Sequence, residues 1–354
     1  MPKLDWVVAE AVYEQHPTEA NRRYFERAAQ VFVQQAPGDS DAGIAHLSLA
    51  RASEDPGAVA RHLRAARADP TLRGDVALTT LHRAVSEFNR AVARNDSATQ
   101  AQVARNILAA LEDIPGKQRR QPWFRALALQ MRVVLEADLP RLLAEIDAML
   151  SEAETDSRVR PVLLWSKLRA LLAAEDRAGL EAMAHAIALR GDDADGERQL
   201  YQFLLELERA ERYALLAALA EPFAAALAGQ GRDLRQLTLL RIRTAVALGD
   251  ADAGFALAQG MVREFPDSGD AWFAYAEVAA QSGRSFEADR AWARIVDATP
   301  AGSPHWRDAM VHRLALAGDP AAACTLAAKL SVYRHLLEQE EKAVLTRVVK
   351  GCSG

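Results

Sequence analysis

The fold is decided by the stretch DAWFAYAEVAAQSGRSFEADRAWARIVDATP, which covers residues 270–300. Its apolar residues recur at the three- and four-residue spacing of two amphipathic helices. They are Trp272, Tyr275, Ala276 and Ala279 in the first half and Ala288, Ala291, Trp292 and Ile295 in the second. Ser282 and Gly283 interrupt the pattern, and Pro300 follows the second half, as is typical of helix ends. The stretch therefore predicts a helical hairpin.

The same residue types return at a fixed interval of 34 residues around this hairpin. The pairs are Gly249 and Gly283, Pro266 and Pro300, and Trp272 and Trp306. A fixed interval between about 20 and 50 residues is typical of stacked supersecondary units. Ala and Leu are abundant and only 6% of the residues are aromatic, so the composition favours helix elsewhere too. We therefore expect an all-α fold of repeated hairpins.

In this register the stretch resembles the tetratricopeptide repeat (TPR) family over residues 233–333. The matching landmarks are two aromatic positions, two small positions, a turn glycine and a late proline: Trp272, Trp292, Ala276, Ala288, Gly283 and Pro300. The neighbouring repeats depart from the pattern, with Thr238 in place of the first aromatic and Gly318 one residue late. The resemblance implies an α-solenoid of antiparallel helical hairpins, a TPR-like superhelix.

Four segments are predicted along the chain. Residues 1–117 form N-terminal, TPR-like helical hairpins, residues 118–232 irregular helical repeats, residues 233–335 TPR-like repeats, and residues 336–354 a C-terminal capping helix and tail. Helix-length segments alternate with short breakers throughout the first two segments, but the 34-residue landmarks are absent between residues 121 and 231. We infer the continuity of the array from the need of each hairpin to cover its apolar face.

Charge, hydropathy and cysteine content predict the location of the chain and exclude some classes of partner. The formal charge of −5 and the isoelectric point near 6.0 provide no positive field for nucleic acid. The longest Ala/Leu-rich run, Tyr213–Gly229, is interrupted by Glu221, which predicts no membrane insertion. Cys324 and Cys352 lie in no CxxC motif, so we expect two reduced, unpaired thiols. Together with an acidic N-terminal stretch, these features predict a cytoplasmic location.

Several residue patterns could indicate chemistry, and each also has a structural interpretation. The chain contains no HExxH, GxSxG or GxxxxGK[ST] motif, which predicts no catalytic site, cofactor or metal. The loop from Gly191 to Gly196 resembles a calcium-binding loop, but Gly191 and Gln202 occupy ligand positions, so we expect helix capping there. His305 and His312 share one predicted helix without a third ligand and are interpreted as core or surface residues. The arginines between residues 61 and 94 are interpreted as a solvated helix face.

The TPR resemblance implies that the first helix of each hairpin lines a concave groove. Carried onto this sequence, the partner-binding positions are Gln236, Leu239, Arg243, Asp270, Phe273, Glu277 and Arg307. Arg243 precedes Glu277 by 34 residues and Arg307 follows Phe273 by 34, so we expect one contiguous patch. The alternative is that Phe273 packs into the next repeat and the charged residues are merely solvated.

The predicted function is that of a non-catalytic protein–protein interaction scaffold or adaptor. An aromatic residue beside charges of both signs suits a partner peptide or helix of another protein. Two alternatives remain open at this point. One is a regulatory TPR protein in which a ligand closes the superhelix, and the other is an enzyme with its site in residues 121–231.

Overall fold

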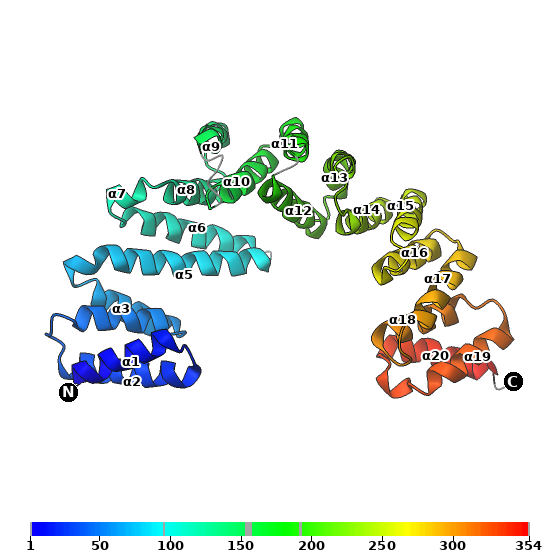
Figure 1. Cartoon of the computed structure of the whole chain (residues 1–354), viewed down its shortest axis with the longest axis horizontal. Helices are drawn as coiled ribbons and strands as arrows, with labels where there is room; N and C mark the ends of the chain where they lie inside the picture. The colour runs from blue at the N-terminus through cyan, green and yellow to red at the C-terminus, as the bar shows by residue number, and fades with distance from the viewer. Residues whose placement is uncertain (1, 95, 153–157, 191–192, 353–354) are drawn as a thin grey trace. The chain divides into compact units, whose positions relative to one another are not determined.

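The chain is all-α in the computed structural model, which describes residues 2–94, 96–152, 158–190 and 193–352. These residues form twenty α-helices and two short 3-10 turns, with no β-strand among them (Figure 1). The predicted all-α class is therefore confirmed. The helices belong to two compact units, residues 1–176 and residues 177–354, and each unit is described by itself.

The N-terminal unit consists of ten helices and one 3-10 turn within the described residues. They are α1 (Pro2–Gln15), α2 (Glu19–Gln35), α3 (Ala42–Ala52), α4 (Pro56–Ala66), η1 (Pro70–Leu72), α5 (Arg73–Ala93), α6 (Ser97–Glu112), α7 (Gly116–Arg119), α8 (Pro122–Val134), α9 (Leu139–Glu152) and α10 (Arg160–Ala173). Neighbouring helices such as α1 and α2, α3 and α4, and α5 and α6 pack as pairs. The helix-pair rhythm expected upstream of the clear repeats is thus present.

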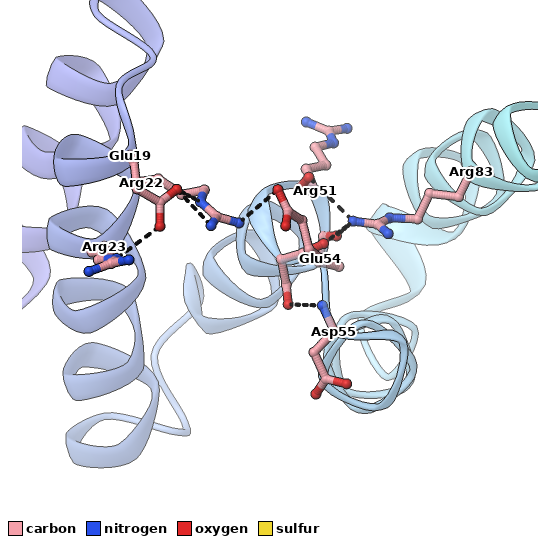
Figure 2. Close-up of polar contacts among 9 residues, drawn as sticks. Glu19, Arg22, Arg23, Arg51, Glu54, Asp55 and Arg83 are labelled. Carbon is pink, nitrogen blue, oxygen red and sulfur yellow. Dashed lines mark hydrogen bonds and ion pairs between the residues drawn. The ribbon is translucent and has the colours of Figure 1, made fainter. Parts of the chain in front are cut away.

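Arg83, which belongs to the predicted solvated face, makes hydrogen bonds within the N-terminal unit. Arg83 on α5 donates hydrogen bonds to the backbone carbonyls of Ala50, at 2.7 Å, and Ser53 at the end of α3 (Figure 2). Nearby, Arg22 on α2 pairs with Glu19 at 2.7 Å and with Glu54 at 3.3 Å. A cation suits the unpaired carbonyls at a helix C-terminus. Arg83 therefore joins α5 to α3 rather than facing solvent alone.

The C-terminal unit consists of the helices that follow. They are α11 (Arg177–Leu189), α12 (Ala194–Arg209), α13 (Tyr213–Ala228), α14 (Arg235–Ala247), α15 (Ala251–Glu264), α16 (Gly269–Gln281), α17 (Ser285–Ala298), α18 (Pro304–Leu316), α19 (Pro320–Ser331), η2 (Arg334–Leu336) and α20 (Gln339–Cys352). Each helix packs against the next one along the chain, and α14 also contacts α12 and α16. Contacts between alternate helices also join α11 to α13 and α18 to α20. The helices are labelled in Figure 1.

The predicted hairpin at residues 270–300 is confirmed as the pair α16 and α17. Ser268 caps α16 by accepting a hydrogen bond from the Ala271 amide. Gly283 has a φ of +74° in the turn, and its counterpart Gly249 has a φ of +81° between α14 and α15. These positive angles favour glycine, which explains why a glycine returns after 34 residues.

Small residues allow α16 and α17 to approach closely. Ala276 and Ala288 are completely buried, and so is Trp292, which packs in the same apolar cluster. Trp306 is also buried in the next cluster, whereas Trp272 is half-buried and donates its indole N–H to the Pro266 carbonyl at 2.8 Å. The tryptophans are therefore framework residues, as predicted.

The acidic loop before α12 is described only in part. Gly191 and Asp192 lie outside the described residues. Asp193 is buried and accepts a hydrogen bond from the Gly196 amide at 2.9 Å. The capping role expected for this loop is confirmed for Asp193.

The prediction of two unpaired cysteines is wrong. Cys324 on α19 and Cys352 at the end of α20 form a disulfide across 28 residues of sequence. The sequence pattern missed this pair because α20 folds back against α19, which no spacing rule predicts. Stable disulfides occur mainly in oxidising compartments, so the cysteines no longer support the cytoplasmic location, which stays a prediction.

Within the described ranges, no helix has the length and hydropathy required to cross a membrane.

Ala276→Trp should destabilise the C-terminal unit by about 1–3 kcal/mol, because the buried position has no room for the indole. Denaturant unfolding followed by circular dichroism measures the loss. Ala256 on α15 is exposed, so Ala256→Trp is the matched control and should unfold like the wild type. Equal stability of the two variants would show that close helix approach at Ala276 is not required.

Reducing the disulfide should lower the stability of the C-terminal unit by about 3.5 kcal/mol, because the reduced, unfolded chain regains loop entropy. Denaturant unfolding with and without a thiol reductant measures the difference. Cys352→Ser should match the reduced wild type and should not respond to reductant. A wild type that is insensitive to reductant would contradict the pairing.

Candidate functional site

A groove in the C-terminal unit lies between α14 and α16 and extends to α17 and α18. Its volume is about 570 Å³, within the range of about 300–1,000 Å³ that is usual for ligand sites. The lining residues are Leu239, Ile242, Arg243, Val246, Ala247, Gly269, Asp270, Phe273, Ala274, Glu277, Val278, Gln281, Ile295, Thr299 and His305. Most of them are apolar, and the charged ones come from α14 and α16.

The helical period explains why these residues share one groove. Leu239, Arg243 and Val246 lie four and three residues apart on α14, and Phe273 and Glu277 lie four apart on α16. Residues at these spacings project from the same side of a helix. Because α14 and α16 contact each other directly, their two rows of side chains face a common space.

The structure brings together five of the seven residues predicted for partner binding. Leu239, Arg243, Asp270, Phe273 and Glu277 all line the groove. The other two lie outside the groove lining. Gln236 is exposed in the first turn of α14, and Arg307 on α18 donates a hydrogen bond to the Leu336 carbonyl in η2.

The ring of Phe273 is packed on one part and exposed to the groove on another. Its ring makes edge contacts with Trp292 on α17, at 4.9 Å between centroids, and with His305 on α18, at 5.8 Å. The residue is half-buried and still lines the groove. The alternative that Phe273 packs against the following helices is therefore correct for part of its ring, while another part remains available to a ligand.

Arg243 is already engaged on one side. Its guanidinium donates to both carboxylate oxygens of Glu208 on α12, at 2.6 and 3.2 Å. This two-point geometry fixes the arginine at the groove wall. Burial raises the pKa of the neighbouring Tyr201 hydroxyl, and the charges of Arg243 and Glu208 act on it as well. The α12 side of the groove is therefore a preformed polar network.

Glu277 is in a different position, because no cation lies within ion-pair distance of its carboxylate in the described part of the chain. The residue is accessible to solvent, yet burial raises the pKa of its carboxyl. Asp308 on α18 raises this pKa further, while His312 and Arg243 lower it. The carboxylate thus lies partly dehydrated beside an apolar surface.

Sequence reasoning missed part of this site. The sequence predicts that His305 is a core or surface residue without a role in a site. In the structure it lines the groove, where its ring contacts that of Phe273. Val246 and Val278 also line the groove, and the three- and four-residue spacing of a helix could have predicted both of them. Glu208 has no such signal, because the 34-residue landmarks do not extend to α12. Among the described residues, no group of three or more His, Cys, Asp or Glu side chains is arranged to hold a metal ion.

Comparison with models of protein families finds none that matches the chain, and a search of curated proteins finds no significant match.

Removing the positive charge of Arg243 should raise the pKa of Glu277 further, and removing the negative charge of Asp308 should lower it. Carboxyl carbon shifts in NMR, followed against pH in Arg243→Gln and Asp308→Asn, measure both changes. Arg290→Gln, on the exposed surface of α17, is the control. Shifts of the same sign in the two groove variants would contradict the assignment.

The raised pKa also has a consequence for stability. The pKa of Glu277 is raised in the folded state above its ordinary value of 4.5, so the folded state binds this proton more tightly than the unfolded state does. The ionised carboxylate therefore disfavours folding. Its contribution to stability should therefore improve as the pH falls through the window above 4.5, and Glu277→Gln should remove this pH dependence.

Proposed function

We propose that the chain is a non-catalytic scaffold or adaptor that binds a short segment of a partner protein in the α14–α16 groove. The observation that carries the proposal is an open groove whose apolar floor includes the half-buried ring of Phe273 and whose walls carry Arg243 and Glu277. Aromatic anchors in pockets contribute much of the affinity of protein interfaces, and surrounding charges set register and specificity.

The arrangement of the groove also supports a protein partner. Its residues come from consecutive turns of two adjacent helices, so a linear segment can contact several of them in series. The engaged Arg243 and the packed part of Phe273 are held in place before binding, which reduces the ordering cost. The TPR-like landmarks from Trp272 to Pro300 support the same proposal, because they predict that alternate helices line a binding surface.

The alternative of an enzyme in residues 121–231 has less support. The groove is lined by residues between 239 and 305, outside that range. Its polar groups are two carboxylates, a guanidinium already paired with Glu208, an imidazole, an amide and a hydroxyl. This set is better suited to recognising a charged segment than to the paired acid and base of a hydrolytic site.

Short linear peptides displayed in a random library provide the test. Peptides selected on the full chain should bind at least about tenfold more weakly to Phe273→Ala, which removes the aromatic anchor. Phe286→Ala is the matched control, because Phe286 is exposed on α17 and does not line the groove. Ala247→Phe, which fills the groove from an exposed position, should also block binding.

Ala256→Phe, an exposed change on α15, is the control for the filling variant. Helicity is measured for every variant, so that loss of folding is separated from loss of binding. If the selected peptides bind Phe273→Ala and Ala247→Phe as well as they bind the wild type, the groove is not the binding site and the proposal fails.

A further inference from the structure

The groove is asymmetric in charge. Its arginine, Arg243, is neutralised by the two hydrogen bonds to Glu208. Glu277 has no such partner in the described part of the chain, and the nearby Asp308 adds a second negative charge. His312, which lowers the pKa of Glu277, lies 3.6 Å from Asp308 and stacks on Trp292. The groove therefore presents a Glu277 carboxylate that no cation of the described residues pairs with directly.

The apolar floor lies directly beside this charge. Phe273 precedes Glu277 by one helical turn, and Ala274 and Val278 of the same helix also line the groove. Leu239 and Val246 face them from α14. A segment that packs on this floor must also cover Glu277 and remove more of its hydration.

Removing that hydration selects among possible ligands. A wholly apolar segment would bury the carboxylate without a partner, which carries a large desolvation cost. An acidic segment would add like-charge repulsion to this cost. A segment with a Lys or Arg beside an apolar residue would cover the floor and provide the missing counter-charge.

From this juxtaposition we infer that the groove takes a partner segment that pairs a Lys or Arg with Glu277 and places an adjacent apolar side chain against Phe273. The inference rests on the proposed function and names the class of its partner. Arg243 and Glu208 fix one wall, and Glu277 recognises the cation. The raised pKa of the Glu277 carboxyl agrees with a site whose ionised form gains from a bound cation.

The test starts from the random peptide library and retains peptides whose binding is lost in Phe273→Ala but kept in Phe286→Ala. This criterion involves no charge, so it does not favour cationic peptides in advance. The retained peptides should be enriched in Lys and Arg next to an apolar residue. Glu277→Gln should weaken their binding about tenfold or more, a loss that corresponds to about 1.4 kcal/mol.

A double-mutant cycle identifies the contact itself. When the Lys or Arg of a peptide is replaced by Gln, Glu277→Gln should have no further effect on the affinity. Glu277→Arg, selected against the same library, should reverse the preference and enrich Asp and Glu. Glu287→Gln on α17, outside the groove, is the matched control and should leave binding unchanged.

The possible outcomes separate this inference from the proposed function. Retained peptides that are neutral or acidic, or that bind Glu277→Gln as tightly as the wild type, overturn the inference while the groove remains a peptide site. A library that yields no peptide dependent on Phe273 overturns both. Additive effects in the double-mutant cycle also overturn the pairing of the peptide cation with Glu277.

Discussion

The close approach of α16 and α17 at two buried alanines is the constraint on which the C-terminal unit depends. Ala276 and Ala288 are completely buried, and the indole of Trp292 fills space in the same cluster. A larger side chain at either alanine would separate the helices, because protein interiors are close-packed. The position of Phe273 against Trp292, and with it the floor of the groove, follows from this packing.

The same packing places a carboxylate where water is partly excluded. Glu277 lies one turn after Phe273, so the helix that carries the aromatic floor also carries the charge. On the neighbouring wall, the charge of Arg243 is compensated within the protein by its hydrogen bonds to Glu208. Glu277 has no equivalent partner in the described residues. This difference between two adjacent walls gives the groove both an apolar surface and a charge preference.

Much of the groove followed from sequence, for a physical reason. Helix faces repeat with a period of 3.6 residues and the hairpins repeat every 34, so two periodicities together placed five predicted residues on one surface. The extrapolation to Arg307 was less successful, because the following hairpin is altered by η2, whose Leu336 carbonyl accepts a hydrogen bond from that arginine. Arg307 is therefore held by η2 and does not line the groove.

The amino-acid sequence by itself determined the all-α class, the turn at Gly283, the buried Trp292 and Trp306, and the helix face that carries Phe273 and Glu277. These features depend on backbone conformation and local periodicity, which act between residues close in the chain. Tertiary structure alone decided that Cys324 pairs with Cys352, that Arg243 bonds Glu208 and that no cation among the described residues pairs with Glu277. Pairing of this kind depends on distances between residues far apart in sequence, which only the packing of the helices sets.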